Sequence, residues 1–177
     1  KESDAFVLFP GGFGTNDECF EVLTLMQTGR SQPAPVVMLD VPGGTYWKGW
    51  YKFVKEQLIG ENYISPEDDS LFLITEDLEE AFEEICRFYR RYHSSRYVDR
   101  KRKLVLRLKK PLSLNGIDKL NLEFDDILSG GTIEKCEPFP EEYDEPELLI
   151  LPRLCLSFNR KSFARLRQLI DRVNSLY

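Results

Sequence analysis

The sequence predicts an α/β fold with a parallel sheet, followed by a smaller α+β module. Short apolar runs alternate three times with stretches of helical periodicity in the first half of the chain, which is typical of a parallel α/β sheet. A polar and basic stretch then breaks this pattern, and half-exposed strands follow it. We therefore expect two units, at 1–93 and 103–177, joined by a linker at 94–102.

Three buried strands are predicted in the first unit. They are the uninterrupted apolar runs 5–9, 36–39 and 71–74, because a strand covered on both faces is apolar throughout. Since strands and helices alternate, we expect a Rossmann-like parallel sheet. Such a sheet normally has roughly five or six strands. We therefore expect only the C-terminal half of the domain here, with the N-terminal half absent or supplied elsewhere.

A helix is predicted after each of these strands. Thr15 is a favourable N-cap for the first helix. The second helix starts at Tyr46 and carries aromatic residues along one stripe. The third helix is expected at 78–93, with Leu78 and Phe82 among the residues that face inward.

The second unit is predicted to have the element order βαββα. We interpret it as a small α+β module, a ferredoxin-like variant. One helix is expected to end near Gly130 and the last to start near Phe163. The expected strands lie at 104–108, 132–136 and 148–158.

Charge is unevenly distributed along the chain. Eleven basic residues lie in the segment 87–110, and seven acidic residues with three prolines lie in 134–147. The basic segment has two interpretations, contact with RNA or a nucleotide, or a solvated linker that meets the acidic segment. The net charge of −6 and the lack of interleaved aromatic residues favour the second. We expect a solvated acidic loop and no nucleic-acid partner.

The composition argues against several classes of function. The sequence has no apolar run of about 18 residues and no signal-peptide pattern, so we expect no membrane contact and a cytoplasmic location. The four cysteines are scattered and His93 is the single histidine, which leaves too few ligands for a zinc site. We expect no metal and no cofactor.

A glycine-rich turn, PGGFGT at 10–15, joins the first predicted strand to its helix. Such a turn brings several backbone N–H groups to one point at a helix N-terminus, where they attract phosphate. Glycine is expected there because a side chain would block the tight turn and the approach of the anion. The residues predicted to bind the phosphate are Gly11, Gly12, Phe13, Gly14 and Thr15.

Glu18 has two interpretations. Thr15 and Glu18 fit a capping box, in which the glutamate returns to the amide of the N-cap. Alternatively, the carboxylate lies one helical turn from a bound phosphate and within reach of its ribose. There it would stabilise an oxocarbenium-like transition state or act on the attacking water in N-glycosidic cleavage.

The turn and its flanks resemble the LONELY GUY (LOG) family, which shares the pattern PGGxGTxxE. The resemblance covers roughly residues 1–92 and continues in the segments Glu21–Thr24, Pro35–Leu39 and Thr75–Ala81. The residues that match the pattern itself are Pro10, Gly11, Gly12, Gly14, Thr15 and Glu18.

The resemblance implies a phosphoribohydrolase, because the family cleaves nucleoside 5′-monophosphates such as AMP or cytokinin nucleotides into free base and ribose 5-phosphate. Glu18 would be the catalytic carboxylate. The resemblance also implies an arginine on the preceding helix, which would lie before Lys1. We therefore expect activity in the intact protein rather than in this chain alone. Family members are typically dimers, so a homodimer is expected.

Two other functions bear on the same sequence. The family has been labelled "possible lysine decarboxylase", but no lysine here is marked out for a pyridoxal Schiff base, so we do not expect a true decarboxylase. The alternative to the enzyme is a non-catalytic nucleotide-binding or carrier protein of related fold. That protein would need the glycine turn, but it would need Glu18 only as a cap.

Overall fold

The computed structural model describes residues 3–176 of the chain. Its contacts divide the chain into two compact units, Lys1–Arg87 and Phe88–Tyr177, and each unit is described by itself below. Among residues 3–176, no helix has both the length and the apolar character needed to span a membrane.

The first unit contains a three-stranded parallel sheet in the order β1–β2–β3, at Phe6–Leu8, Val36–Leu39 and Leu73–Thr75. Strand β2 pairs in parallel with both neighbours, and all four of its residues are buried. Three short apolar runs therefore form the expected Rossmann-like parallel sheet, and the predicted fold class is confirmed.

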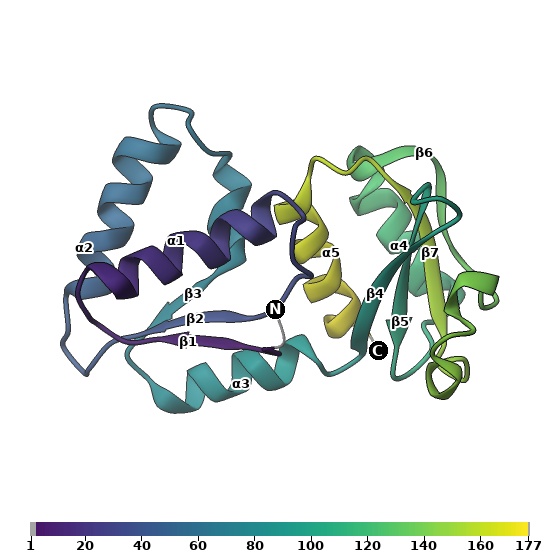
Figure 1. Ribbon diagram of the computed structural model, residues 1–177, viewed down its shortest axis with the longest axis horizontal. Coiled ribbons are helices and arrows are strands. Elements are labelled where there is room, and N and C mark those ends of the chain that lie inside the picture. The colour runs from purple at the N-terminus through teal and green to yellow at the C-terminus, as the bar shows by residue number, and fades with distance from the viewer. Residues whose placement is uncertain (1–2, 177) are drawn as a thin grey trace. The chain divides into compact units, whose positions relative to one another are not determined.

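Helices cover both faces of this sheet (Figure 1). Met38 packs with Cys19 of α1 and Trp47 of α2 on one face. Val37 packs with Ala81 of α3 on the other, as the alternation of side chains along a strand requires. The helices are α1 at Phe13–Gln27, α2 at Tyr46–Phe53 and α3 at Leu78–Phe88; a π-helical turn at Val54–Ile59 and a 3-10 helix at Pro66–Leu71 lie between α2 and β3.

Helix α3 differs from its prediction in length and orientation. It ends at Phe88 rather than near residue 93, because strand β4 begins at Tyr92. Leu78 and Phe82, which were expected to face inward, are 69% and 62% exposed. Ala81 is the position of this helix that packs against Val37, so the helix is rotated relative to the expected stripe.

The second unit is a four-stranded antiparallel sheet in the order β4–β5–β7–β6. Its element order is ββαββα, with one more strand than predicted. The extra strand precedes β5 and occupies the edge that the last strand of a ferredoxin-like βαββαβ module would take. The elements are β4 Tyr92–Val98, β5 Lys103–Leu108, α4 Leu114–Glu123, β6 Leu128–Lys135, β7 Arg153–Phe158 and α5 Phe163–Ser175; short 3-10 helices lie at Asp125–Ile127, Pro140–Glu142 and Pro146–Leu148.

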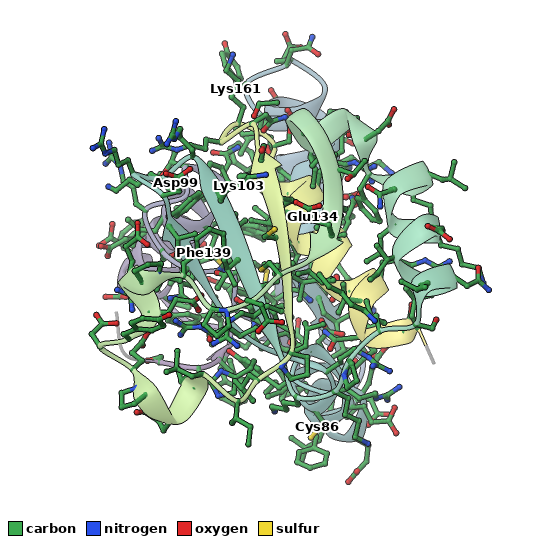
Figure 2. The ribbon with its side chains drawn as sticks, turned by 90° about the vertical axis from the view of Figure 1, so that its right-hand side faces the viewer. Cys86, Asp99, Lys103, Glu134, Phe139 and Lys161 are labelled. Atoms are coloured by element: carbon green, nitrogen blue, oxygen red, sulfur yellow. The ribbon has the colours of Figure 1, made fainter. Side chains whose placement is uncertain are left out.

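The segment 94–102 does not form the linker that the sequence predicted. Residues 94–98 belong to β4 and residues 99–102 form the turn to β5. Asp99 begins this turn and Lys103 follows it (Figure 2). Serine and arginine at partly exposed strand positions hid the strand, because their polarity is typical of a loop. The division between the units lies instead at Arg87/Phe88.

Most residues of the acidic segment are exposed, as expected of a solvated loop, but part of the segment packs on one face of the second sheet. Glu142 is fully buried, and its Oε1 accepts from Nε of Arg107 at 2.8 Å and of Arg153 at 3.2 Å. Phe139, labelled in Figure 2, packs with the buried residues of this face. The basic and acidic segments therefore pair as expected, both at the surface, where Arg96 pairs with Asp144, and inside the fold at Glu142.

Electrostatics of this cluster favour the ionised carboxylate. Burial by itself raises the pKa of Glu142, but the amide of Phe139 and the two arginines outweigh burial, so the pKa lies below its usual value. A lowered pKa contributes stability that is present at neutral pH and is lost as the pH falls through the folded-state value.

We expect Glu142→Gln to lower the free energy of unfolding by roughly 3–5 kcal/mol, because the change leaves Arg153 buried without its carboxylate partner. Urea unfolding at neutral pH measures this loss. Glu147→Gln is the matched control, since Glu147 lies in the same segment and is exposed. The difference between wild type and Glu142→Gln should shrink below about pH 4; a difference that stays constant with pH would contradict the buried ion pair.

Candidate functional site

The glycine turn ends in a helix start that no side chain caps. Helix α1 begins at Phe13, and its N-cap is Gly12 at φ −86° and ψ −154°. The first hydrogen bond of the helix runs from Asn16 N to Gly12 O at 3.3 Å. The amides of Phe13, Gly14 and Thr15 therefore precede the intrahelical ladder, as the first amides of any helix do.

The helix start corrects the prediction for Thr15. This residue is the third of the helix, not its N-cap, so Thr15 and Glu18 do not form a capping box. Gly12 takes the cap position in an extended conformation, which glycine tolerates nearly as well as threonine. Without a capping box, Glu18 is not the capping residue that its first interpretation required.

The three glycines of the turn are not equivalent. A Cβ on Gly11 would lie 2.1 Å from Thr15 Oγ1, so packing within the turn requires glycine there. A Cβ on Gly12 or Gly14 would meet no atom within 4 Å, and none of the three has a positive φ. The expected steric need for glycine within the turn therefore holds at Gly11 only. An anion bound to the amides would occupy the open space beside Gly12 and Gly14.

Two side chains that the sequence did not mark as site residues contact the turn. The hydroxyl of Tyr46, the first residue of α2, donates to Gly11 O at 2.7 Å. The amide Nδ2 of Asn16 donates to Gly12 O at 3.1 Å and to the Tyr46 hydroxyl at 2.8 Å. No local signal predicts this contact, because Tyr46 lies 35 residues from Gly11.

Glu18 lies in the second turn of α1, four residues after Gly14 and three after Thr15. Residues at these spacings share one side of a helix. The side chain is exposed, and in the described part of the chain no hydrogen bond or ion pair holds its carboxylate. Glu18 therefore lies on the same side of α1 as Gly14 and Thr15, and its catalytic role stays a prediction.

A cavity of about 210 Å³, lined in part by charged side chains, lies at the carboxyl ends of β2 and β3. Asp40, 8% exposed, accepts from Val41 N at 2.9 Å and from Trp47 N at 3.3 Å. Glu76 accepts from Gly43 N at 2.6 Å and pairs with Lys48. These carboxylates hold the turn between β2 and α2.

Lys48, together with the Gly43 amide, lowers the pKa of Glu76, so this carboxylate stays ionised in its bracing role. A Cβ on Gly44 would lie 2.2 Å from Asp40 Oδ1, which requires glycine at that position. Among residues 3–176, no three histidine, cysteine, aspartate or glutamate side chains converge on a metal site.

The first unit is similar to known proteins. Residues 1–85 match the family model described as "Possible lysine decarboxylase". Cytokinin riboside 5′-monophosphate phosphoribohydrolase LOG1 of Arabidopsis thaliana is 41% identical over 66 residues, which are 37% of this chain and 29% of that protein. Residues 1–85 are therefore similar to proteins of the LOG family.

Two other LOG proteins are also similar to this chain. The rice protein named probable cytokinin riboside 5′-monophosphate phosphoribohydrolase LOGL3 is also 41% identical over 66 residues, 29% of its length. A second rice relative, LOGL6, is 32% identical over 85 residues, which are 48% of this chain and 32% of that protein. The chain thus spans about three tenths of the length of these LOG relatives. The family match ends two residues before the division between the units.

We expect Gly14→Ala to weaken binding of ribose 5-phosphate about tenfold or more while raising stability. The added methyl group enters space that the anion needs, whereas alanine in a helix is favoured over glycine by roughly 0.5–1 kcal/mol. Calorimetric titration and thermal unfolding of the intact protein measure the two effects.

Gly49→Ala is the control, because Gly49 lies in α2 and a Cβ there also meets no atom within 4 Å. It should raise stability and leave binding unchanged. Equal affinity of wild type and Gly14→Ala would show that the anion does not bind at this helix start.

Proposed function

We propose that the intact protein hydrolyses the N-glycosidic bond of a nucleoside 5′-monophosphate, such as AMP or a cytokinin nucleotide, to free base and ribose 5-phosphate. The observation that carries the proposal is an uncapped helix start one turn from an exposed carboxylate without a partner in the described chain. The names of the LOG relatives, which are phosphoribohydrolases of a nucleoside monophosphate, support the same reaction.

In this proposal the glycine turn binds the phosphate through the amides of Phe13, Gly14 and Thr15, and Gly11 allows the turn to close. Helix N-termini bind anions because their N–H groups and dipole point at the ligand. The phosphate fixes the ribose, so that C1′ lies within reach of Glu18. The phosphate contact thus holds the ribose beside the carboxylate in both the substrate and the transition state.

Glu18 then acts on the reacting atoms. As the bond between C1′ and the base breaks, positive charge develops on the ribose, and a carboxylate beside it lowers the energy of that oxocarbenium-like state. Water adds its oxygen to C1′ and the departing base takes up a proton. Glu18 either stabilises the developing charge or accepts the proton of the attacking water.

The alternative is a nucleotide-binding protein without catalysis. It uses the same amides and open space, and it differs in giving Glu18 no chemical role. Since Glu18 forms no capping box, this alternative leaves the carboxylate without a function. Assembly into a homodimer remains a prediction from the family resemblance.

We expect Glu18→Gln to reduce release of ribose 5-phosphate from AMP by about two to three orders of magnitude. Stability should change by less than about 0.5 kcal/mol, because Glu18 is an exposed side chain without a cap to lose. Affinity for AMP should be retained or increase, since a negative charge beside the phosphate is removed.

The intact protein is assayed for base release, AMP binding and thermal unfolding. Asp17→Asn, an exposed change of the same kind at the neighbouring position, should leave all three unchanged. Wild-type turnover in Glu18→Gln would exclude the catalytic assignment and favour the nucleotide-binding protein.

A further inference from the structure

Side chains hold two carbonyl groups of the glycine turn, those of Gly11 and Gly12. The Tyr46 hydroxyl donates to Gly11 O and accepts from Asn16 Nδ2. The second N–H of the Asn16 amide donates to Gly12 O. Every polar hydrogen of this pair of side chains is therefore used on the turn or on the other member of the pair.

Fixing these carbonyls also fixes the amides that would bind an anion. A peptide unit is planar and trans, so its C=O and the following N–H point in opposite directions and rotate together. Gly11 O and the N–H of Gly12 share one such unit, and Gly12 O and the N–H of Phe13 share the next. A turn of glycines has little intrinsic resistance to rotation of these units.

We infer that Tyr46 and Asn16 are positioning residues for the phosphate-binding turn. By holding the carbonyls of Gly11 and Gly12, they aim the N–H groups of Gly12 and Phe13 away from those contacts and toward the phosphate monoester. In their absence the unit shared by Gly11 and Gly12 can rotate and present a carbonyl oxygen, which repels an anion, whereas Gly12 O still accepts from Asn16 N. The inference rests on the proposed function for the nature of the ligand, the phosphate of a nucleotide.

The Tyr46 hydroxyl is well placed for this role because the ring beneath it is fixed. The ring contacts Trp47 edge-on, with centroids 4.8 Å apart, and Trp47 is fully buried in the core of the first unit. Asp40 in turn accepts from the amide of Trp47. Tyr46→Phe therefore keeps the ring packing and removes one hydroxyl.

The experiment compares Tyr46→Phe and Asn16→Ala with Tyr51→Phe in the intact protein. Tyr51 lies on the same helix, and its hydroxyl donates to Asp69 at 3.4 Å, away from the turn. Ribose 5-phosphate is titrated calorimetrically. We expect about tenfold weaker binding in Tyr46→Phe and Asn16→Ala, and wild-type binding in Tyr51→Phe.

Two readouts separate positioning from a general loss of structure. The effects of Tyr46→Phe and Asn16→Ala should combine to less than their product in the double variant, because both act on the same turn. For AMP turnover, KM should rise with little change in kcat, since the phosphate contact is the same in substrate and transition state. Multiplicative effects, accompanied by equal losses in thermal stability, would overturn the inference.

The remaining outcomes distinguish this inference from the proposed function. Equal binding of ribose 5-phosphate by wild type and Tyr46→Phe overturns the inference and leaves hydrolysis intact. Weaker binding in Tyr46→Phe without base release by wild type supports the inference and removes the hydrolase. No binding by wild type overturns the inference, whatever the turnover.

Discussion

Parallel pairing on both sides of β2 is the constraint on which the candidate site depends. The strand is buried along its whole length and bonds to β1 and β3. Parallel strands bring their carboxyl ends to one edge of the sheet, where α/β proteins bind their ligands. The glycine turn after β1 and the turn after β2 therefore meet, and Tyr46 reaches Gly11 across 35 residues of sequence.

Two carboxylates of this unit brace the turn between β2 and α2, whereas Glu18 does not brace the fold. Asp40 and Glu76 accept from backbone amides around the turn before α2, and that turn carries Tyr46 to the glycine turn. Glu18 has no such duty among the described residues. A charged group that is neither paired nor used as a cap can be changed at little cost to the fold, so a variant of Glu18 tests chemistry separately from stability.

Sequence periodicity predicted the parts of the fold that follow from local pattern. Strand β2 and the helix after the glycine turn required only an apolar run and an i, i+3, i+4 stripe. The start of that helix was misplaced by three residues, because threonine is a favoured N-cap residue by type, whereas Gly12 takes the N-cap position in the structure. Strand β4 was missed because an arginine such as Arg96 is expected in a solvated loop. In the fold, Arg96 lies in the strand and pairs with Asp144 and Glu145.

Long-range pairing explains what local pattern could not supply. Glu142 was predicted to lie in a solvated loop, and its burial depends on Arg107 and Arg153, which are 35 and 11 residues away. The contact of Tyr46 with Gly11 is of the same kind. The glycines and Glu18 could be proposed from sequence because they form one short motif, whereas the side chains that hold the motif come from another helix.

Charge balance at the candidate site sets a further requirement. Helix α1 carries the acidic residues Asp17, Glu18 and Glu21 and no basic residue. The positive end of a helix is equivalent to roughly half a unit charge, which is less than the charge of a phosphate monoester. A bound phosphate and Glu18 would therefore repel each other unless a cation lay between or beside them. Lys48 is already paired with Glu76. An arginine of the kind that the LOG resemblance implies on the preceding helix would supply this charge, and would allow phosphate and carboxylate to act on one ribose.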